Sequence, residues 1–318
     1  MQVLITGGAG FIGSTLCEAL IARGDAVTVI DNFDPYYDPA IKRRNLRLAL
    51  ESESFSLVEG DIRDAELVAD VFKTAQPEAV VHLAALAGVR QSLADPISFN
   101  DVNVSGTLVV LEAARQYGKP RFVLASTSSV YGESPHIPYR EDDPLLNCIS
   151  PYGASKIACE KYGYIYHDVH GLDVTALRFF TAYGPRQRPD MAIHLFARAI
   201  MDGRELTLFG DGSTSRDYTY IGDIVAGVVA AIDAGRGFNT ANLGHGTATP
   251  LIDLVRQIEA ECGATARIKY LPEQPGDPRH TCADISRARE LFGYAPQTPL
   301  ATGIREFVGW LRLESEYS

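Results

Sequence analysis

Residues 7–13 read GGAGFIG and place three glycines (Gly7, Gly10 and Gly13) at three-residue intervals. A short apolar run precedes this stretch, and residues 11–23 follow it with helical spacing that stops before a further glycine. A glycine turn between a strand and a helix lets the backbone approach a pyrophosphate, and the helix N-terminus directs its amides at the phosphates. The stretch predicts a dinucleotide-binding turn, with a plain strand-to-helix turn as the alternative.

The two predicted strands that follow supply acidic ends. The apolar run at residues 26–30 ends at Asp31, followed by Asn32. A carboxylate at this place accepts hydrogen bonds from the ribose hydroxyls and repels a 2′-phosphate, which favours NAD over NADP. Asp61 and Ile62 follow a third predicted strand and are expected to reach the adenine, although Asp61 could equally be a helix N-cap.

Further apolar runs alternate with segments of helical spacing through the first 180 residues. They lie at residues 57–59, 79–83, 122–125 and 174–177. This alternation predicts an α/β fold with a Rossmann-type, doubly wound parallel sheet. We expect an NAD-binding domain at residues 1–180.

The second half of the chain is richer in proline and glycine. We expect residues 181–318 to be mainly a smaller α+β substrate-binding domain, with a hairpin-like segment at 206–220. Parts of residues 215–245 have the pattern of a helix and a strand that return to the large sheet.

The composition narrows the class of protein. The chain has 318 residues, a formal net charge of −11 and no block of lysine and arginine, which argues against a nucleic-acid partner. It has no run of about 18 apolar residues and no signal-peptide pattern, so no membrane association is expected. The five scattered cysteines form no C-x-x-C pair, which indicates a reduced, cytoplasmic protein without a metal site.

The stretch SPYGASK (150–156) carries a candidate catalytic pair. Tyr152 and Lys156 are four residues apart, so on a helix they share a face. A phenol with a pKa of about 10 is a poor base at neutral pH, but a nearby ammonium group and a cationic nicotinamide both favour the phenolate. Upstream, LASTSSVYG (124–132) ends a predicted strand in hydroxyl groups, one of which could relay a proton to Tyr152. These hydroxyl residues are Ser126, Thr127, Ser128 and Ser129.

Together these segments resemble the extended short-chain dehydrogenase/reductase family, and within it the nucleotide-sugar epimerases. The resemblance covers nearly the whole chain. Besides the stretches quoted above it rests on HLAA (82–85), NVSGT (103–107), RFFTAYGPRQRP (178–189), SRDYTYIGDI (215–224) and PGDPRHTCAD (275–284).

The resemblance implies a tightly held NAD, a catalytic set of Thr127, Tyr152 and Lys156, and a nucleoside-diphosphate sugar as substrate. It also implies contacts to the cofactor beyond the glycines, from Phe11, Ile12, Leu83, Ala84, Ala85, Asn103, Ser126, Tyr152 and Lys156. It suggests a homodimer.

Within this family the chain is most similar to UDP-glucuronate 4-epimerases. The similar segments include DNFDPYYDPAIKRRNL (31–46), LAGVRQS (86–92) and TAYGPRQRPDMA (181–192). Thr127 is followed by two serines, whereas a 4,6-dehydratase of the family has an Asp-Glu pair there and a decarboxylase has a glutamate. The resemblance therefore implies epimerisation at sugar carbon 4 through a transient 4-keto intermediate, with UDP-glucuronate converted to UDP-galacturonate.

Two arginines, Arg186 and Arg188, stand in a stretch with neither helical nor strand periodicity. A 4-keto glucuronate is a β-keto acid that loses carbon dioxide easily, and a charge-assisted arginine contact suits the task of holding its carboxylate. By the resemblance Arg188 takes this role, with Ser128 and Thr181 as hydroxyl partners. A solvated loop or a diphosphate contact is the alternative for either arginine.

The remaining substrate-binding candidates are less specific. Phe209 could cover the uracil ring or be a core aromatic residue. Arg216 and Asp277 are expected at the diphosphate and the uridine ribose. Arg90, Ser129 and Arg279 complete the set. UDP-glucose or UDP-N-acetylglucosamine epimerisation, an NAD(P)H-dependent sugar-nucleotide reductase and a non-catalytic NAD sensor remain as alternative functions.

Overall fold

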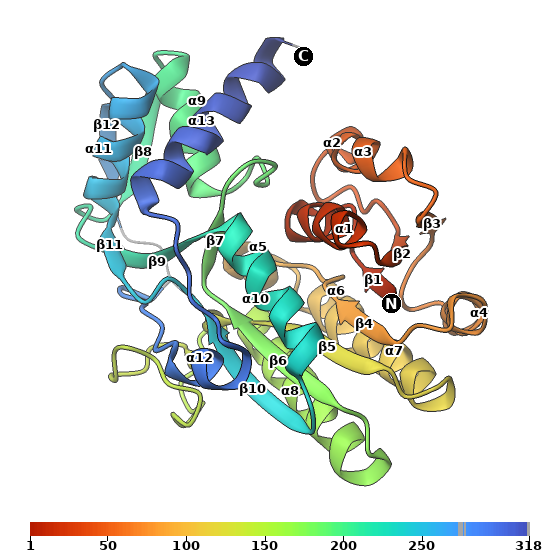
Figure 1. The fold of residues 1–318 in the computed structure, drawn as a ribbon. Helices are drawn as coiled ribbons and strands as arrows, with labels where there is room; N and C mark the ends of the chain where they lie inside the picture. Colours follow the sequence, from red (N-terminus) through yellow and green to blue (C-terminus); the bar gives the residue numbers. More distant parts are fainter. Residues whose placement is uncertain (273–275, 277, 317–318) are drawn as a thin grey trace.

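The computed structural model describes residues 1–272, 276 and 278–316. Its main element is a seven-stranded, fully parallel sheet in the order β10-β6-β5-β4-β1-β2-β3 (Figure 1). The strands are β1 (Gln2–Thr6), β2 (Ala26–Asp31), β3 (Phe55–Glu59), β4 (Ala79–His82), β5 (Arg121–Thr127), β6 (Val174–Phe179) and β10 (Phe238–Leu243). The predicted doubly wound α/β fold is confirmed.

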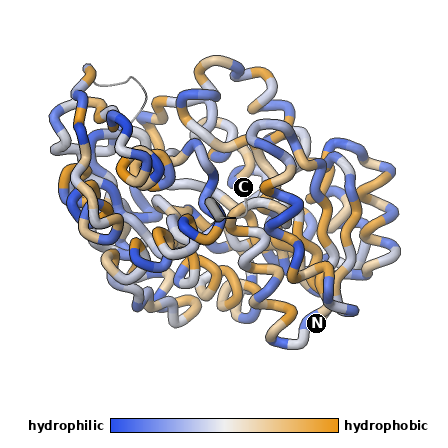
Figure 2. Tube along the Cα trace, turned by 90° about the horizontal axis from the view of Figure 1, so that it is seen from above, coloured by the Kyte–Doolittle hydropathy of each residue, from blue (hydrophilic) through white to orange (hydrophobic). Residues whose placement is uncertain are grey.

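Helices cover both faces of this sheet because its strands are apolar on both sides. One face packs against α1 (Phe11–Arg23), α10 (Ile221–Ala234) and α12 (Ser286–Phe292). The other packs against α4 (Ala65–Ala75), α7 (Gly106–Gln116) and α8 (Pro151–His170). Figure 2 shows hydrophobic and hydrophilic residues interspersed along the coiled parts of the trace, as expected when one side of a helix is buried.

The strand order reverses direction between β1 and β4. β2 and β3 lie on one side of β1, whereas β4, β5 and β6 extend on the other. In open α/β sheets the crevice beyond the carboxyl ends of the strands at such a switch point is the usual ligand site. Short helices and turns surround this edge: α2 (Pro39–Asn45), α3 (Arg47–Leu50), α5 (Val89–Ala94), α6 (Pro96–Asn100), η1 (Asp101–Ser105) and η2 (Ser128–Tyr131).

The remaining elements form a smaller α+β layer beside the sheet (Figure 1). Two small sheets, β11-β9-β7 and β12-β8, pack with three helices around a separate apolar cluster. These elements are β7 (Thr181–Tyr183), β8 (Glu205–Phe209), β9 (Ser215–Tyr220), β11 (Ala248–Pro250), β12 (Arg267–Leu271), α9 (Ala192–Met201), α11 (Leu251–Cys262) and α13 (Leu300–Glu316).

The hairpin expected at residues 206–220 is wrong. β8 pairs in parallel with β12, and β9 pairs with β7 and β11, so the two strands belong to different sheets. The alternating pattern of apolar and polar residues indicates strands correctly but does not identify their partners. Further along, α10 packs against α1 and β10 joins the edge of the large sheet beside β6.

Neither a membrane-spanning helix nor a metal-binding group is found among the described residues. No helix in this part of the chain is both long and apolar enough to cross a membrane. Nor do three histidine, cysteine, aspartate or glutamate side chains of the described residues gather in a group that could hold a metal ion.

Candidate active site

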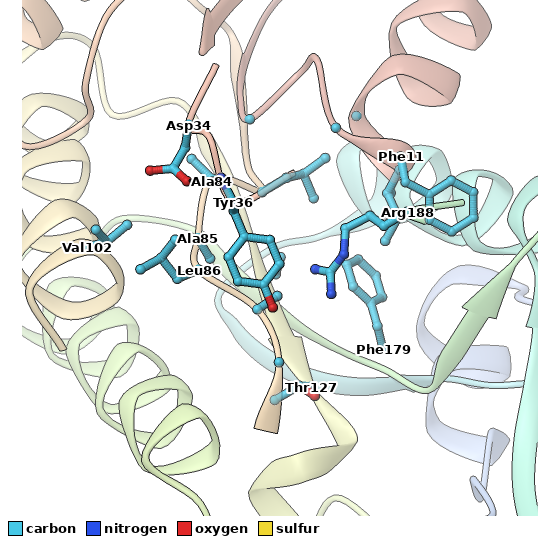
Figure 3. A pocket seen from close by; sticks show the side chains of 18 of the residues that line it. Phe11, Asp34, Tyr36, Ala84, Ala85, Leu86, Val102, Thr127, Phe179 and Arg188 are labelled. Atoms are coloured by element: carbon cyan, nitrogen blue, oxygen red, sulfur yellow. Dashed lines mark hydrogen bonds between the residues drawn. The ribbon is translucent and has the colours of Figure 1, made fainter. Parts of the chain in front are cut away.

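A cavity of about 500 Å³ opens at the switch point of the large sheet. It extends from the glycine turn after β1, past the ends of β4 and β5, to the loop that follows β7 (Figure 3). Most of the residues predicted for the site line it: Gly7, Gly10, Phe11, Ile12, Gly13, Asp31, Asn32, Asp61, Ile62, Leu83, Ala84, Ala85, Ser126, Thr127, Ser128, Ser129, Tyr152, Lys156, Thr181 and Arg188.

The glycine turn has the geometry of a phosphate cradle. Gly7 has a φ of 74°, and a Cβ there would lie 2.7 Å from the backbone nitrogen of Ala84. A Cβ on Gly13 would lie 2.4 Å from the carbonyl oxygen of Gly7. Helix α1 begins after Gly10 without a side-chain cap, so its first amides are directed at the cavity. These features fit a dinucleotide pyrophosphate.

The acidic residues beyond β2 and β3 lie together at one end of the cavity. The buried carboxylate of Asp31 accepts hydrogen bonds from the amides of Ala9 and Phe33, both at 2.9 Å. The Asn32 amide donates to Asp61 at 3.1 Å. Hydrogen bonds from Arg63 are the main cause that lowers the pKa of Asp61 to about 2. This end therefore holds two carboxylates in fixed positions, as hydrogen bonds to ribose hydroxyls require.

The candidate catalytic pair lies on α8, as predicted. The Ser150 hydroxyl caps this helix by accepting a hydrogen bond from Gly153, and Pro151 occupies its first turn. Lys156 is only 2% exposed, and its Nζ donates to the carbonyl of Ala125 at 2.9 Å. Burial lowers the pKa of Lys156 and raises that of Tyr152, although a hydrogen bond with Thr127 opposes the second shift.

The hydroxyl groups of Ser126 and Thr127 at the end of β5 have different partners. Thr127 caps the turn that follows by accepting from the Ser129 amide, and its hydroxyl donates to Ser129 Oγ at 3.2 Å. Ser126 Oγ instead donates to the buried carboxylate of Glu160 at 2.5 Å. Thr127 is thus the hydroxyl beside Tyr152, whereas Ser126 anchors the strand end to α8.

The two arginines after β7 have different surroundings. Arg186 forms an ion pair with Glu18 of α1 at 2.7 Å and has a φ of 69°. Arg188 faces the cavity, where its guanidinium group bonds to Asp190 and lies 5.2 Å from the centre of the Tyr36 ring (Figure 3). Burial tends to lower the pKa of Arg188, but Asp190 outweighs it and the pKa is raised. Of the two arginines, only Arg188 therefore lies in the cavity lining, which it shares with Tyr152 and Lys156.

Several predicted residues lie outside the cavity lining. Asn103 is fully buried, and its amide bonds to both backbone groups of Leu86 and to Ser155 Oγ, so it holds the cavity wall rather than forming it. The Arg90 guanidinium lies over the Phe209 ring at 4.7 Å. Arg216 Nη1 donates to the carbonyl of Arg279 at 3.1 Å. Asp277 lies outside the described residues. The substrate and cofactor contacts expected of these residues stay predictions.

Several lining residues were not among the predicted site residues, notably those of the segment after β2. Asp34, Tyr36, Tyr37 and Lys42 all line the cavity, as do Phe179 and Met191. The only signal for the first four was the similarity of residues 31–46 to the epimerases, because this segment has no periodicity of its own.

The fold and the cavity define a Rossmann-type nucleotide-binding protein with the Tyr-x-x-x-Lys pair of the short-chain dehydrogenases/reductases. The family model described as "GDP-mannose 4,6 dehydratase" matches residues 4–307, and the chain belongs to this family.

Two of the relatives carry the name UDP-glucuronate 4-epimerase. UDP-glucuronate 4-epimerase 4 of Arabidopsis thaliana is 41% identical, over 98% of this chain and 75% of that protein. UDP-glucuronate 4-epimerase of Thermodesulfobacterium geofontis is 40% identical, over 96% of this chain and 95% of its own length.

Two solved structures of nucleotide-sugar 4-epimerases have a similar fold. UDP-glucuronic acid 4-epimerase from Bacillus cereus, crystallised with UDP-glucuronic acid and NAD, has a TM-score of 0.94 and 34% identity, covering 99% of this chain and 100% of that one. UDP-glucose 4-epimerase of Thermotoga maritima, crystallised with UDP-glucose, has a TM-score of 0.92 and 33% identity with the same coverage. The resemblance inferred from the sequence motifs is confirmed.

Proposed function

We propose that this protein is an NAD-dependent isomerase that converts UDP-glucuronate to UDP-galacturonate by epimerisation at sugar carbon 4. The observation that carries the proposal is the joint presence of Tyr152, Thr127 and Arg188 around one cavity that also contains the glycine turn. The relatives with this activity, similar over nearly the whole chain, support it.

The residues at the glycine turn fit NAD, because a side chain at Gly7 or Gly13 would occupy the space of the backbone around the cradle. When bound, NAD supplies the centre that takes a hydride from sugar carbon 4 and returns it to the opposite face. The chain's own part is to hold the reactants and to move one proton. Tyr152 removes the proton of the 4-hydroxyl group and later returns it, and Thr127 is placed to hydrogen-bond the same oxygen.

Lys156 stabilises this arrangement from inside the protein. Lys156 lies one helical turn beyond Tyr152 on the same face of α8. Its ammonium group is held in place by the hydrogen bond to the Ala125 carbonyl. A buried cation in this position favours the phenolate form that proton removal requires.

Arg188 determines which sugar is used. The sugar carboxylate lies next to carbon 5, and in the 4-keto state the bond between carbons 5 and 6 breaks easily if it aligns with the carbonyl π-system. A guanidinium group that binds the carboxylate keeps this bond out of that alignment. Ser128 and Thr181, which also line the cavity, are the proposed hydroxyl partners.

The UDP part of the substrate is proposed to extend toward the smaller layer, where Arg90, Phe209, Arg216 and Arg279 remain the predicted contacts. UDP-glucose epimerisation is the second candidate, because the Thermotoga maritima enzyme has almost the same fold. A homodimer remains a prediction from the family resemblance.

An Arg188→Ala variant tests the proposed contact between Arg188 and the sugar carboxylate. We expect turnover of UDP-glucuronate to fall about a hundredfold, because a charge-assisted contact is lost, while the NAD content stays unchanged. Arg23→Ala is the matched control, since Arg23 pairs with Asp25 and Asp233 away from the cavity. Unchanged turnover of Arg188→Ala without decarboxylated product would show that Arg188 does not hold the carboxylate.

A further inference from the structure

The Arg188 guanidinium group is held along one edge. Its Nε donates to Asp190 Oδ1 and its Nη2 donates to Asp190 Oδ2, both at 3.0 Å. A guanidinium group can offer carboxylates a second bidentate edge, formed by Nη1 and the other Nη2 proton. Among the described residues no hydrogen bond to Nη1 of Arg188 is found, so this second edge is available to a ligand in the cavity.

One face of the same guanidinium group is covered. The ring centre of Tyr36 lies 5.2 Å from its central carbon, within the range of a cation–π contact. Figure 3 shows the ring beside Arg188, with the Tyr36 hydroxyl on the side of Thr127. Tyr36 itself is held by its backbone, since its amide donates to Asp34 Oδ1 at 2.8 Å.

The Tyr36 hydroxyl does not explain the position of this ring. It is buried and has no hydrogen-bond partner among the described residues, so it does not anchor the side chain. Burial, the largest cause, raises the pKa of Tyr36 to about 12, which keeps the phenol neutral beside Arg188. The ring is therefore the part of Tyr36 that acts on the arginine.

We propose that Tyr36 and Asp190 are positioning residues that fix the Arg188 guanidinium plane and turn its second edge toward the sugar carboxylate. The proposal rests on the proposed function and extends it to two residues that touch Arg188. Asp190 also neutralises the charge of Arg188, so a substrate carboxylate meets a pair with no net charge. Tyr36 and Asp190 therefore fix the orientation of the Arg188 hydrogen bonds to the substrate carboxylate rather than strengthen the electrostatic attraction between them.

Loss of direction has a defined chemical consequence. If the carboxylate of the 4-keto sugar rotates into alignment, the bond between carbons 5 and 6 breaks and carbon dioxide leaves. The electron pair of that bond forms an enolate over carbons 4 and 5, which takes a proton from water at carbon 5. The product is a UDP-4-keto-pentose, and the hydride taken from carbon 4 would not be returned to the sugar, so bound NAD would be left reduced.

The test compares four purified variants with the wild type on UDP-glucuronate: Tyr36→Leu, Tyr36→Phe, Asp190→Ala and Asp233→Asn. Proton NMR measures UDP-galacturonate and decarboxylated products, and absorbance measures trapped reduced nicotinamide. Asp233→Asn is the matched control, because both Asp233 carboxylate oxygens accept from Arg23 Nη1 on the outside of α1 and α10. Bound NAD and thermal unfolding are measured for every variant to exclude loss of folding.

For Tyr36→Leu and Asp190→Ala we expect kcat for epimerisation to fall about tenfold to a hundredfold, as for a misplaced reacting group. Decarboxylated products should appear in both. KM for UDP-glucuronate should stay the same or fall in Asp190→Ala, because the full charge of Arg188 is then exposed to the substrate. Tyr36→Phe, which keeps the ring, and Asp233→Asn should retain the wild-type product ratio.

Two results would overturn the proposal. One is a wild-type product ratio and kcat in both Tyr36→Leu and Asp190→Ala. The other is a Tyr36→Phe variant that forms as much decarboxylated product as Tyr36→Leu, which would assign the effect to the hydroxyl group. A wild-type protein that does not epimerise UDP-glucuronate would instead refute the proposed function, so the two failures are distinguishable.

Discussion

The buried ion pair between Glu160 and Arg178 is the place where stability and the site are most closely linked. Arg178 of β6 donates to both carboxylate oxygens of Glu160 on α8, at 2.9 and 2.8 Å, and both side chains are 5% exposed. The same carboxylate accepts from Ser126 in the cavity wall and lies one turn beyond Lys156. Replacing one partner alone should therefore be far more harmful than replacing both.

The expected loss of unfolding free energy follows from the burial of the ion pair. Glu160→Leu leaves the Arg178 charge buried and unpaired, which costs about 3–5 kcal/mol of unfolding free energy. For 318 residues the unfolding entropy is about 0.67 kcal/mol/K, so the melting temperature should fall by about 4.5–7.5 °C. Glu160→Leu combined with Arg178→Met leaves mainly the Ser126 hydroxyl unpaired, which costs about 1–3 kcal/mol or roughly 1.5–4.5 °C.

Thermal unfolding at neutral pH, followed by circular dichroism with NAD content recorded for each sample, measures both values. We expect the double variant to melt several degrees above Glu160→Leu. If the double variant melts at or below the single variant, the pair contributes its own net stability and the reasoning from buried, unpaired charge is wrong.

Three further predictions concern the cavity and its support. Gly13→Ala should abolish co-purification of NAD, measured by absorbance after denaturation, because its Cβ would lie 2.4 Å from a backbone oxygen. Tyr152→Phe should retain NAD and lose epimerisation by about a hundredfold or more, measured by NMR; near-normal turnover would exclude Tyr152 as the base. Burial, and next the charge of Lys156, lower the pKa of His82 to about 3, below the ordinary 6.5. Because the unfolded chain then binds the extra proton, stability should fall as pH drops from about 6.5 toward 3, and His82→Gln should show a flatter dependence of melting temperature on pH.

The inner strands of the large sheet could be predicted from the sequence because they are buried on both faces. They therefore appear as short runs rich in apolar residues, and the runs at residues 26–30 and 174–177 lie within β2 and β6. Helix α1 was predicted with its observed ends, since Gly24 has a φ of 90° that stops the helix. The local rules that define these elements act over a few residues.

The small sheets could not be predicted in the same way. β7 has three residues, and it pairs with β9 more than thirty residues later in the chain. Pairing at this distance depends on packing around the shared cluster of α9, α11 and α13, which no local pattern records. The incorrect hairpin at residues 206–220 has the same cause.

The site residues likewise divide into those that could be predicted from the sequence and those that could not. The glycine turn and the Tyr152–Lys156 pair have fixed spacing on regular elements, so they could be selected from the sequence. Tyr36 could not be selected, because its position depends on the loop after β2 and on a contact with Arg188 more than 150 residues away. Asp190 lies two residues from Arg188, but its hydrogen bonds depend on the conformation of the loop after β7.

The most direct test of the proposed activity is a proton NMR time course of the purified protein with UDP-glucuronate, and in parallel with UDP-glucose, without added cofactor. We expect new anomeric signals of UDP-galacturonate, no decarboxylated product, and little or no conversion of UDP-glucose. Conversion of UDP-glucose alone would contradict the role given to Arg188, and no conversion of either sugar would contradict the proposed activity itself.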